Sequence, residues 1–202
     1  DITGEELDRE VRAQLRTMSR AAAERVARHL VAAGRLLDED PELALAHAEA
    51  ARADGGRLAV VREACGVAAY TAGRYEKALA EFRAARRISG SVEYLPMMAD
   101  SERGLGRPER ALELAASEDA AKLDRAGRIE LKIVEAGARR DLGQLEAALQ
   151  VLEVPELRSA KVAPWTMRLH YAYADTLEAL GRREEAASWF AKAQIADVDN
   201  ET

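Results

Sequence analysis

The sequence predicts an all-α protein built of repeated helix pairs, and two observations support this. First, a glycine followed five residues later by an alanine occurs four times, at Gly73, Gly106, Gly143 and Gly181. These glycines are separated by 33, 37 and 38 residues, spacings typical of stacked helical repeats. Second, aromatic residues make up only 4% of the chain although hydrophobic residues make up 48%. The core is therefore expected to consist mainly of alanine, leucine and valine, which suits closely packed helices.

Each of the four glycines is predicted to end one helix, and the alanine after it to lie in the next helix. Glycine reverses the chain after a helix because it adopts the left-handed conformation without a Cβ clash. Arg74, Arg107 and Arg182 directly follow three of the glycines, where a cation suits the negative helix end. The small alanine lets two antiparallel helices approach closely. Each unit is thus an αα-hairpin, and such hairpins bury their apolar faces by stacking.

Two segments, residues 59–92 and 167–198, resemble the tetratricopeptide repeat family. The matching positions are Gly66, Gly73, Tyr75, Ala78, Phe82 and Ala85 in the first segment and Ala174, Gly181, Ala186, Phe190 and Ala193 in the second. Partial matches are Ala99, Gly106 and Ala111 within residues 92–125 and Ala136, Gly143, Ala148 and Leu152 within residues 129–162. The whole chain is also similar to tetratricopeptide proteins of actinobacteria. The resemblance implies a right-handed α-α superhelix of four to five helix pairs preceded by an N-terminal helix.

The N-terminal helix is expected within residues 1–18, because Thr3 and Glu6 have the spacing of a capping box. We expect this helix to span about residues 4–18 and to cap the array. A single solenoid domain is expected over residues 19–202. Its approximate units are 19–56, 57–90, 91–120, 121–158 and 159–198.

Capping residues and prolines place the remaining helices. The predicted helices span about residues 20–37, 41–53, 57–72, 75–88, 92–104, 108–117, 124–142, 145–153, 165–180 and 183–196. Ser19 and Asp40 are the expected N-caps. Pro96 predicts a delayed start for the helix over 92–104, and prolines make residues 155–164 the weakest helical stretch. Residues 197–202 are expected to form a polar tail, and no strand is expected.

Composition disfavours several classes of function. Acidic residues outnumber basic ones by 36 to 30, which disfavours nucleic-acid binding because that affinity depends on neutralising phosphates. The single cysteine excludes an internal disulfide and favours a reducing compartment. No uncharged apolar run is long enough to span a membrane. Arginine far exceeds lysine and alanine is abundant, which indicates a bacterial source, and together with the single cysteine this leads us to expect a bacterial cytoplasmic protein.

Reactive side chains form no recognisable catalytic or metal-binding motif. His29, His47 and His170 are far apart in the sequence and lack metal-ligand neighbours. Cys65 is expected to be buried and inert, because no basic partner lies near it in the sequence. Phosphate-binding and nucleophile-elbow motifs are absent. We therefore expect no enzymatic activity, no metal and no cofactor.

In the resembled family, the first helices of the units line a concave groove. The register carries over to Glu63, Val67, Tyr70, Asp100, Arg103, Ile133, Arg140, Arg168, Tyr171, Asp175 and Glu178. Such a surface suits an extended or helical peptide, since tyrosine supplies contact area and arginine pairs with carboxylates. The alternative is that these charges only solvate helix faces and pair with one another.

The resulting functional expectation is a non-enzymatic scaffold that binds a protein or peptide. The alternative is a sensor or regulatory module of a larger protein, which binds a peptide or a small effector. The C-terminal face carries Phe190, Ala193 and Ile195 without a following helix to cover it. Such an exposed apolar face predicts self-association or a partner there.

Overall fold

The computed structural model describes the backbone of residues 2–200 and the side chains as far as residue 196. Within this range all regular secondary structure is helical, with eleven α-helices and two short 3₁₀ helices. The all-α prediction is thereby confirmed. The chain divides into two compact units, unit 1 ending at Tyr94 and unit 2 beginning at Leu95.

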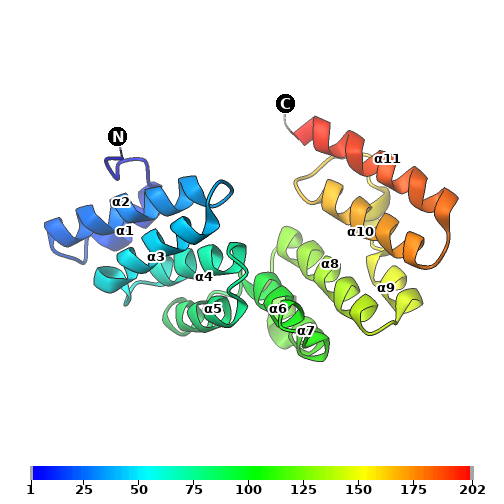
Figure 1. The fold of residues 1–202 in the computed structure, drawn as a ribbon, viewed down its shortest axis with the longest axis horizontal. Helices are drawn as coiled ribbons and strands as arrows, with labels where there is room; N and C mark the ends of the chain where they lie inside the picture. The colour runs from blue at the N-terminus through cyan, green and yellow to red at the C-terminus, as the bar shows by residue number, and fades with distance from the viewer. Residues whose placement is uncertain (1, 201–202) are drawn as a thin grey trace. The chain divides into compact units, whose positions relative to one another are not determined.

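Unit 1, in the part that the structure describes, contains a short N-terminal helix and two helix pairs (Figure 1). The helices are α1 (Arg9–Leu15), α2 (Arg20–Leu36), α3 (Pro41–Gly55), α4 (Ala59–Thr71) and α5 (Tyr75–Ser89). Helix α3 packs against both α2 and α4, and α2 also contacts α4. The predicted N-caps are formed: the Ser19 hydroxyl accepts a hydrogen bond from the N–H of Ala22, and the Asp40 carboxylate accepts one from the N–H of Leu43.

The N-terminal segment differs from its prediction, because residues 3–6 form a turn and the helix begins only at Arg9. The Glu6 carboxylate accepts hydrogen bonds from the N–H and hydroxyl groups of Thr3 and from the N–H of Gly4. Gly4 has a φ of +89°, which no helix contains. A Cβ at Gly4 would lie 2.7 Å from that of Ala27, so the turn packs directly on α2. The Thr-x-x-Glu spacing therefore closes a turn instead of capping a helix.

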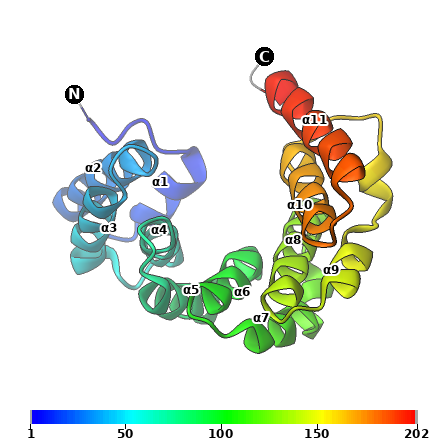
Figure 2. The same ribbon diagram turned by 45° about the vertical axis from the view of Figure 1, so that its right-hand side comes forward.

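Unit 2, as far as the structure describes it, contains three helix pairs (Figure 2). They are α6 (Leu95–Gly104) with α7 (Pro108–Ala115), α8 (Arg125–Asp141) with α9 (Leu145–Leu152), and α10 (Thr166–Ala179) with α11 (Arg183–Asn200). Helix α8 packs against α6 and α10, and α10 also contacts α9 and α11. These contacts bring the first helices of successive pairs side by side.

Prolines and helix ends behave mostly as predicted in unit 2. Helix α6 starts at Leu95, so its start is delayed as Pro96 predicts. Two 3₁₀ helices, Glu118–Lys122 and Pro155–Arg158, lie in the connections after α7 and α9. The predicted polar tail was wrong for residues 197–200, which continue α11 to Asn200. The rest of that prediction, residues 201–202, lies outside the described residues.

The four repeated glycines close the same turn in every pair that carries the pattern. Their φ angles lie between +68° and +77°. In the turn after α4, the N–H of Gly73 donates to the carbonyl of Tyr70, and the N–H of Arg74 donates to the carbonyl of Ala69. The same pair of bonds closes the turns at Gly106, Gly143 and Gly181. This double bond pattern is a Schellman motif, which satisfies the last carbonyls of the first helix.

Small residues bring the two helices of a pair into close contact. The alanines that follow the turns are fully or almost fully buried, and they are Ala78, Ala111, Ala148 and Ala186. In unit 1, Gly66 lies against the ring of buried Phe82, and a Cβ at Gly66 would approach that ring to 2.5 Å. The predicted alanine-rich helix contacts are thereby confirmed within each unit.

Candidate functional site

The surface predicted from the family register corresponds, in unit 2, to a pocket of about 540 Å³ between α6, α8 and α10. We call it the unit-2 pocket. It is lined by Arg103, Ile133, Ala136, Gly137, Arg140, Met167, Arg168, Tyr171, Ala172, Asp175 and Thr176. The pocket therefore combines an apolar floor with arginines and one carboxylate.

Arg103 is held by two carboxylates. Its Nε lies 2.8 Å from Oδ2 of Asp141 on α8, and its Nη1 lies 2.8 Å from Oδ1 of Asp100. Burial opposes the charged form of this guanidinium, but the hydrogen bonds and charges of the two aspartates more than offset it and raise the pKa of Arg103. The side chain crosses α8 at Gly137, where a Cβ would lie 2.5 Å from Cζ of Arg103. Gly137 thus provides the space that lets Arg103 reach Asp141.

The other two arginines of the unit-2 pocket are paired as well. Arg140 on α8 forms an ion pair with Asp175 on α10, through Nη1. Arg168 on α10 forms one with Glu130 on α8, through Nη2. The pairing of charges that the alternative expects is thus present at these arginines, while binding in the groove stays a prediction. The pairs connect α8 and α10 across the pocket.

Tyr171 is the exposed aromatic residue of this pocket. Its side chain lines the pocket although the residue is 54% exposed. Its ring lies 5.3 Å from that of Phe190 on α11, with an interplanar angle of 63°. This edge-to-face contact with Phe190 favours one orientation of the Tyr171 ring.

The remaining predicted groove residues lie outside the unit-2 pocket. Glu178 is exposed near the end of α10 and does not line it. In unit 1, Glu63 and Val67 line a smaller pocket of about 200 Å³ that also contains Tyr94. Burial, followed by the charge of nearby Glu93, raises the pKa of Glu63. Tyr70 lies one turn along α4, with its ring 6.0 Å from that of Tyr75.

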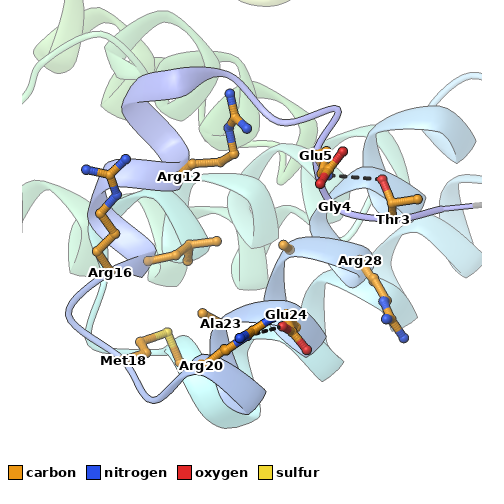
Figure 3. Close-up of a pocket in the computed structure, with 12 residues that line it drawn as sticks. Thr3, Gly4, Glu5, Arg12, Arg16, Met18, Arg20, Ala23, Glu24 and Arg28 are labelled. Atoms are coloured by element: carbon orange, nitrogen blue, oxygen red, sulfur yellow. Dashed lines mark hydrogen bonds and ion pairs between the residues drawn. The ribbon is translucent and has the colours of Figure 1, made fainter.

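A second large pocket, which was not predicted from the sequence, lies in unit 1 between the N-terminal turn, α1 and α2 (Figure 3). We call it the unit-1 pocket, and its volume is about 550 Å³. It is lined by Thr3, Gly4, Glu5, Arg12, Leu15, Arg16, Met18, Arg20, Ala23, Glu24, Ala27 and Arg28. The one available signal was the spacing of Arg12 and Arg16, which places two cations one helical turn apart.

The histidine and cysteine side chains pack within or between neighbouring helices. Nδ1 of His29 and Nδ1 of His47 lie 2.9 Å apart, so one ring donates and the other accepts, a contact that the sequence did not predict. Nε2 of buried His170 lies 3.1 Å from the carbonyl of Leu157. Cys65 is buried as predicted, and burial raises the pKa of its thiol to about 12. In the described part of the chain, no three potential metal ligands come together.

The C-terminal face is only partly apolar. Ile195 is 63% exposed, whereas Phe190 is half-buried against Tyr171. Trp189 contacts the ring of Tyr173, and Nζ of Lys192 lies 3.8 Å above the Trp189 ring. Self-association through this face stays a prediction. No helix that the structure describes is long and apolar enough to cross a membrane.

Comparison with models of known protein families finds no match for this chain, and comparison with curated proteins finds none either. The two pockets are therefore the features of this chain that bear on its function.

Proposed function

We propose that the chain is a non-enzymatic scaffold that binds a peptide segment of another protein in the unit-2 pocket. Exposed Tyr171 is the observation that carries this proposal. A large aromatic ring at 54% exposure has much contact area to bury, and Phe190 already restricts its orientation. Tyrosine side chains of this kind are frequent anchors at protein interfaces because they lose little conformational entropy on binding.

The ion pairs of the unit-2 pocket indicate how the peptide would be held. Arg140 pairs with Asp175 through Nη1 and Arg168 pairs with Glu130 through Nη2, and arginine has five N–H donors. Both can therefore keep their carboxylate partner while they donate to a peptide carbonyl or carboxylate. Because Asp175 and Glu130 already fix these arginines, less side-chain entropy is lost on binding. Arg103 donates hydrogen bonds to Asp100 and Asp141 from all three of its side-chain nitrogens. Its role is therefore to hold α6 and α8 together beside the pocket.

We also propose a tetratricopeptide-like array in a bacterial cytoplasm as the setting of this activity. The four Schellman turns, the buried alanines and the Gly66–Phe82 contact support the repeat assignment. The single cysteine supports a reducing compartment. A regulatory module that binds a small effector is the second candidate, because pockets of about 540 and 550 Å³ fall within the size range of small-molecule sites.

Selection from a random peptide display library tests the main proposal. Peptides selected on the full chain would be measured by fluorescence anisotropy against the wild type and a Tyr171→Ala/Arg140→Gln variant. We expect the double variant to weaken binding at least about tenfold, because it removes the aromatic anchor and a charged donor. Helicity by circular dichroism should be unchanged, since Tyr171 is exposed.

The matched control is Ile88→Ala/Arg110→Gln. Ile88 is 49% exposed, Arg110 is exposed, and neither lines the unit-2 pocket. This control should bind every selected peptide like the wild type. If no selected peptide distinguishes the pocket variant from the control, the unit-2 pocket is not the binding surface.

A further inference from the structure

The unit-1 pocket carries four arginines against two glutamates, in a chain whose net charge is −6. Nε of Arg20 pairs with Glu24 at 2.9 Å. By contrast, Arg12, Arg16 and Arg28 form no ion pair with any residue that the structure describes. All three are exposed. Three guanidinium groups are therefore available to a ligand around one cavity.

Below these cations lies an apolar floor. Leu15 and Ala27 are buried at 4% and 7% exposure, and Met18 and Ala23 pack half-buried against the same core. Figure 3 places Arg12 on α1 and Arg16 directly after that helix at one wall, and Arg28 on α2 at the other. A ligand seated here would bury an apolar group between walls that carry unpaired positive charge.

We propose that the unit-1 pocket binds an acidic peptide segment that carries an apolar side chain. Guanidinium groups match carboxylates in charge and in fork geometry. Arg12 and Arg16 lie one helical turn apart, about 5–6 Å between their Cβ atoms, and Arg28 is on a different helix. A single carboxylate cannot reach all three, whereas carboxylates at intervals along a peptide can.

Two features favour a peptide over a nucleic acid. The apolar floor suits a leucine-like side chain, which a sugar-phosphate backbone lacks. Glu5 and Glu24 also line the pocket, and together with the net charge of −6 they oppose a uniformly anionic polymer. This site lies in unit 1 and does not depend on peptide binding in unit 2, so either activity can fail without the other.

The experiment measures fluorescence anisotropy of a fluorescein-labelled hexapeptide of alternating glutamate and leucine, titrated with the full chain at physiological ionic strength. We expect Arg12→Gln/Arg16→Gln to weaken binding at least about tenfold. The matched control, Arg57→Gln/Arg110→Gln, removes the same charge from two exposed arginines outside the pocket and should change affinity less than about twofold. A peptide with serine in place of leucine should bind at least about tenfold more weakly, because it cannot use the floor.

Several results would overturn the proposal. Equal weakening by the pocket and control variants would show non-specific charge attraction. Equal binding of the serine peptide would show that the floor is not used. Binding to phosphatidylglycerol vesicles without binding to the peptide would identify an anionic lipid surface as the ligand. No binding of the leucine peptide at millimolar protein would also exclude the site. Circular dichroism of each variant checks that the helices are intact.

Discussion

The two units hold pockets of nearly equal volume, about 550 Å³ in unit 1 and about 540 Å³ in unit 2, and both are rich in arginine. They differ in what the guanidinium groups contact. Arg103, Arg140 and Arg168 in unit 2 are all paired with carboxylates from neighbouring helices or the same helix. Arg12 and Arg16 in unit 1 have no such partner among the described residues.

This difference separates two roles of arginine. A paired arginine that links two helices is part of the structure, so its removal leaves carboxylates facing one another and lowers stability. An unpaired exposed arginine contributes little to stability and has its donors available for a ligand. Removal of an arginine should therefore lower stability in unit 2, whether or not it also weakens binding there, and should leave stability almost unchanged in unit 1.

The largest stability effect is expected for Arg103→Ala compared with Arg16→Ala. Without Arg103, the carboxylates of Asp100 and Asp141 lose their shared cation, and we expect unit 2 to lose about 1–2 kcal/mol after allowance for solvent screening. Arg16→Ala should change stability by less than about 0.5 kcal/mol. Urea unfolding followed by tryptophan fluorescence measures the first effect directly, because Trp165 and Trp189 both lie in unit 2. Circular dichroism monitors Arg16→Ala.

The control for Arg103→Ala removes the charges that the arginine neutralises. Adding Asp100→Asn and Asp141→Asn to Arg103→Ala should restore most of the lost stability. If the Arg103→Ala variant instead unfolds at the same urea concentration as the wild type, the paired arginines of unit 2 do not stabilise it. The proposed difference between paired and unpaired arginines would then be wrong.

A smaller effect is expected from adding a Cβ to a helical glycine in each unit. Gly34→Ala in α2 should stabilise by about 0.5–1 kcal/mol, because alanine favours helix and no atom lies within 4 Å of the added carbon. Gly137→Ala in α8 should lack this gain, since the new Cβ displaces Arg103 from its aspartates. Thermal unfolding of both variants measures the difference.

The background of Arg103→Ala provides the decisive comparison for Gly137. Once the arginine side chain is gone, Gly137→Ala should stabilise by about as much as Gly34→Ala does in the wild type. A stabilising effect of Gly137→Ala with Arg103 still present would show that the guanidinium is not held against α8.

The features that the sequence predicted well are local ones. Gly73, Gly106, Gly143 and Gly181 mark turns because the left-handed conformation is a property of one residue and its immediate neighbours. Pro96 likewise delays the start of α6, because proline is tolerated in the first turn of a helix but not further along it. Thr3 and Glu6 show the limit of local reasoning, since the same spacing can cap a helix or close a turn. The packing of Gly4 on Ala27 decides between them here.

The features that the sequence could not predict depend on how helices face one another. Arg103 meets Asp141, 38 residues away, only because α6 and α8 pack with Gly137 between them. His29 meets His47 for a similar reason, through the packing of α2 on α3. The unit-1 pocket forms where the N-terminal turn, α1 and α2 come together. Such contacts require the rotation and spacing of whole helices, which residue types alone do not determine.

The smallest expected effect is a difference in how the pKa values of two surface carboxylates, Glu6 and Glu185, respond to salt. Hydrogen bonds from the backbone N–H of Glu6 itself and from the Thr3 hydroxyl lower the pKa of Glu6 from 4.5 to about 2. In unit 2, a side-chain hydrogen bond from Arg182 and the charge of that residue lower the pKa of Glu185. NMR titration of the two carboxyl carbons should therefore show different responses. Raising the salt concentration should move the pKa of Glu185 upward more than that of Glu6, because backbone and hydroxyl hydrogen bonds hold Glu6 in addition to its ion pair with Arg35.

The sign of the effect on stability follows from the direction of the shift at Glu6. Its folded-state pKa lies below the ordinary value, so the turn is stabilised by the carboxylate above about pH 4.5, and this contribution is lost as the pH falls toward 2. Thr3→Val removes the hydroxyl donor and should raise the pKa of Glu6 toward 4.5. The stabilisation of the turn by this carboxylate would then be lost at a higher pH. The wall of the unit-1 pocket would then loosen at a higher pH than in the wild type. A Glu6 titration midpoint near 4.5 in the wild type would instead mean that the N-terminal turn is not held by this carboxylate.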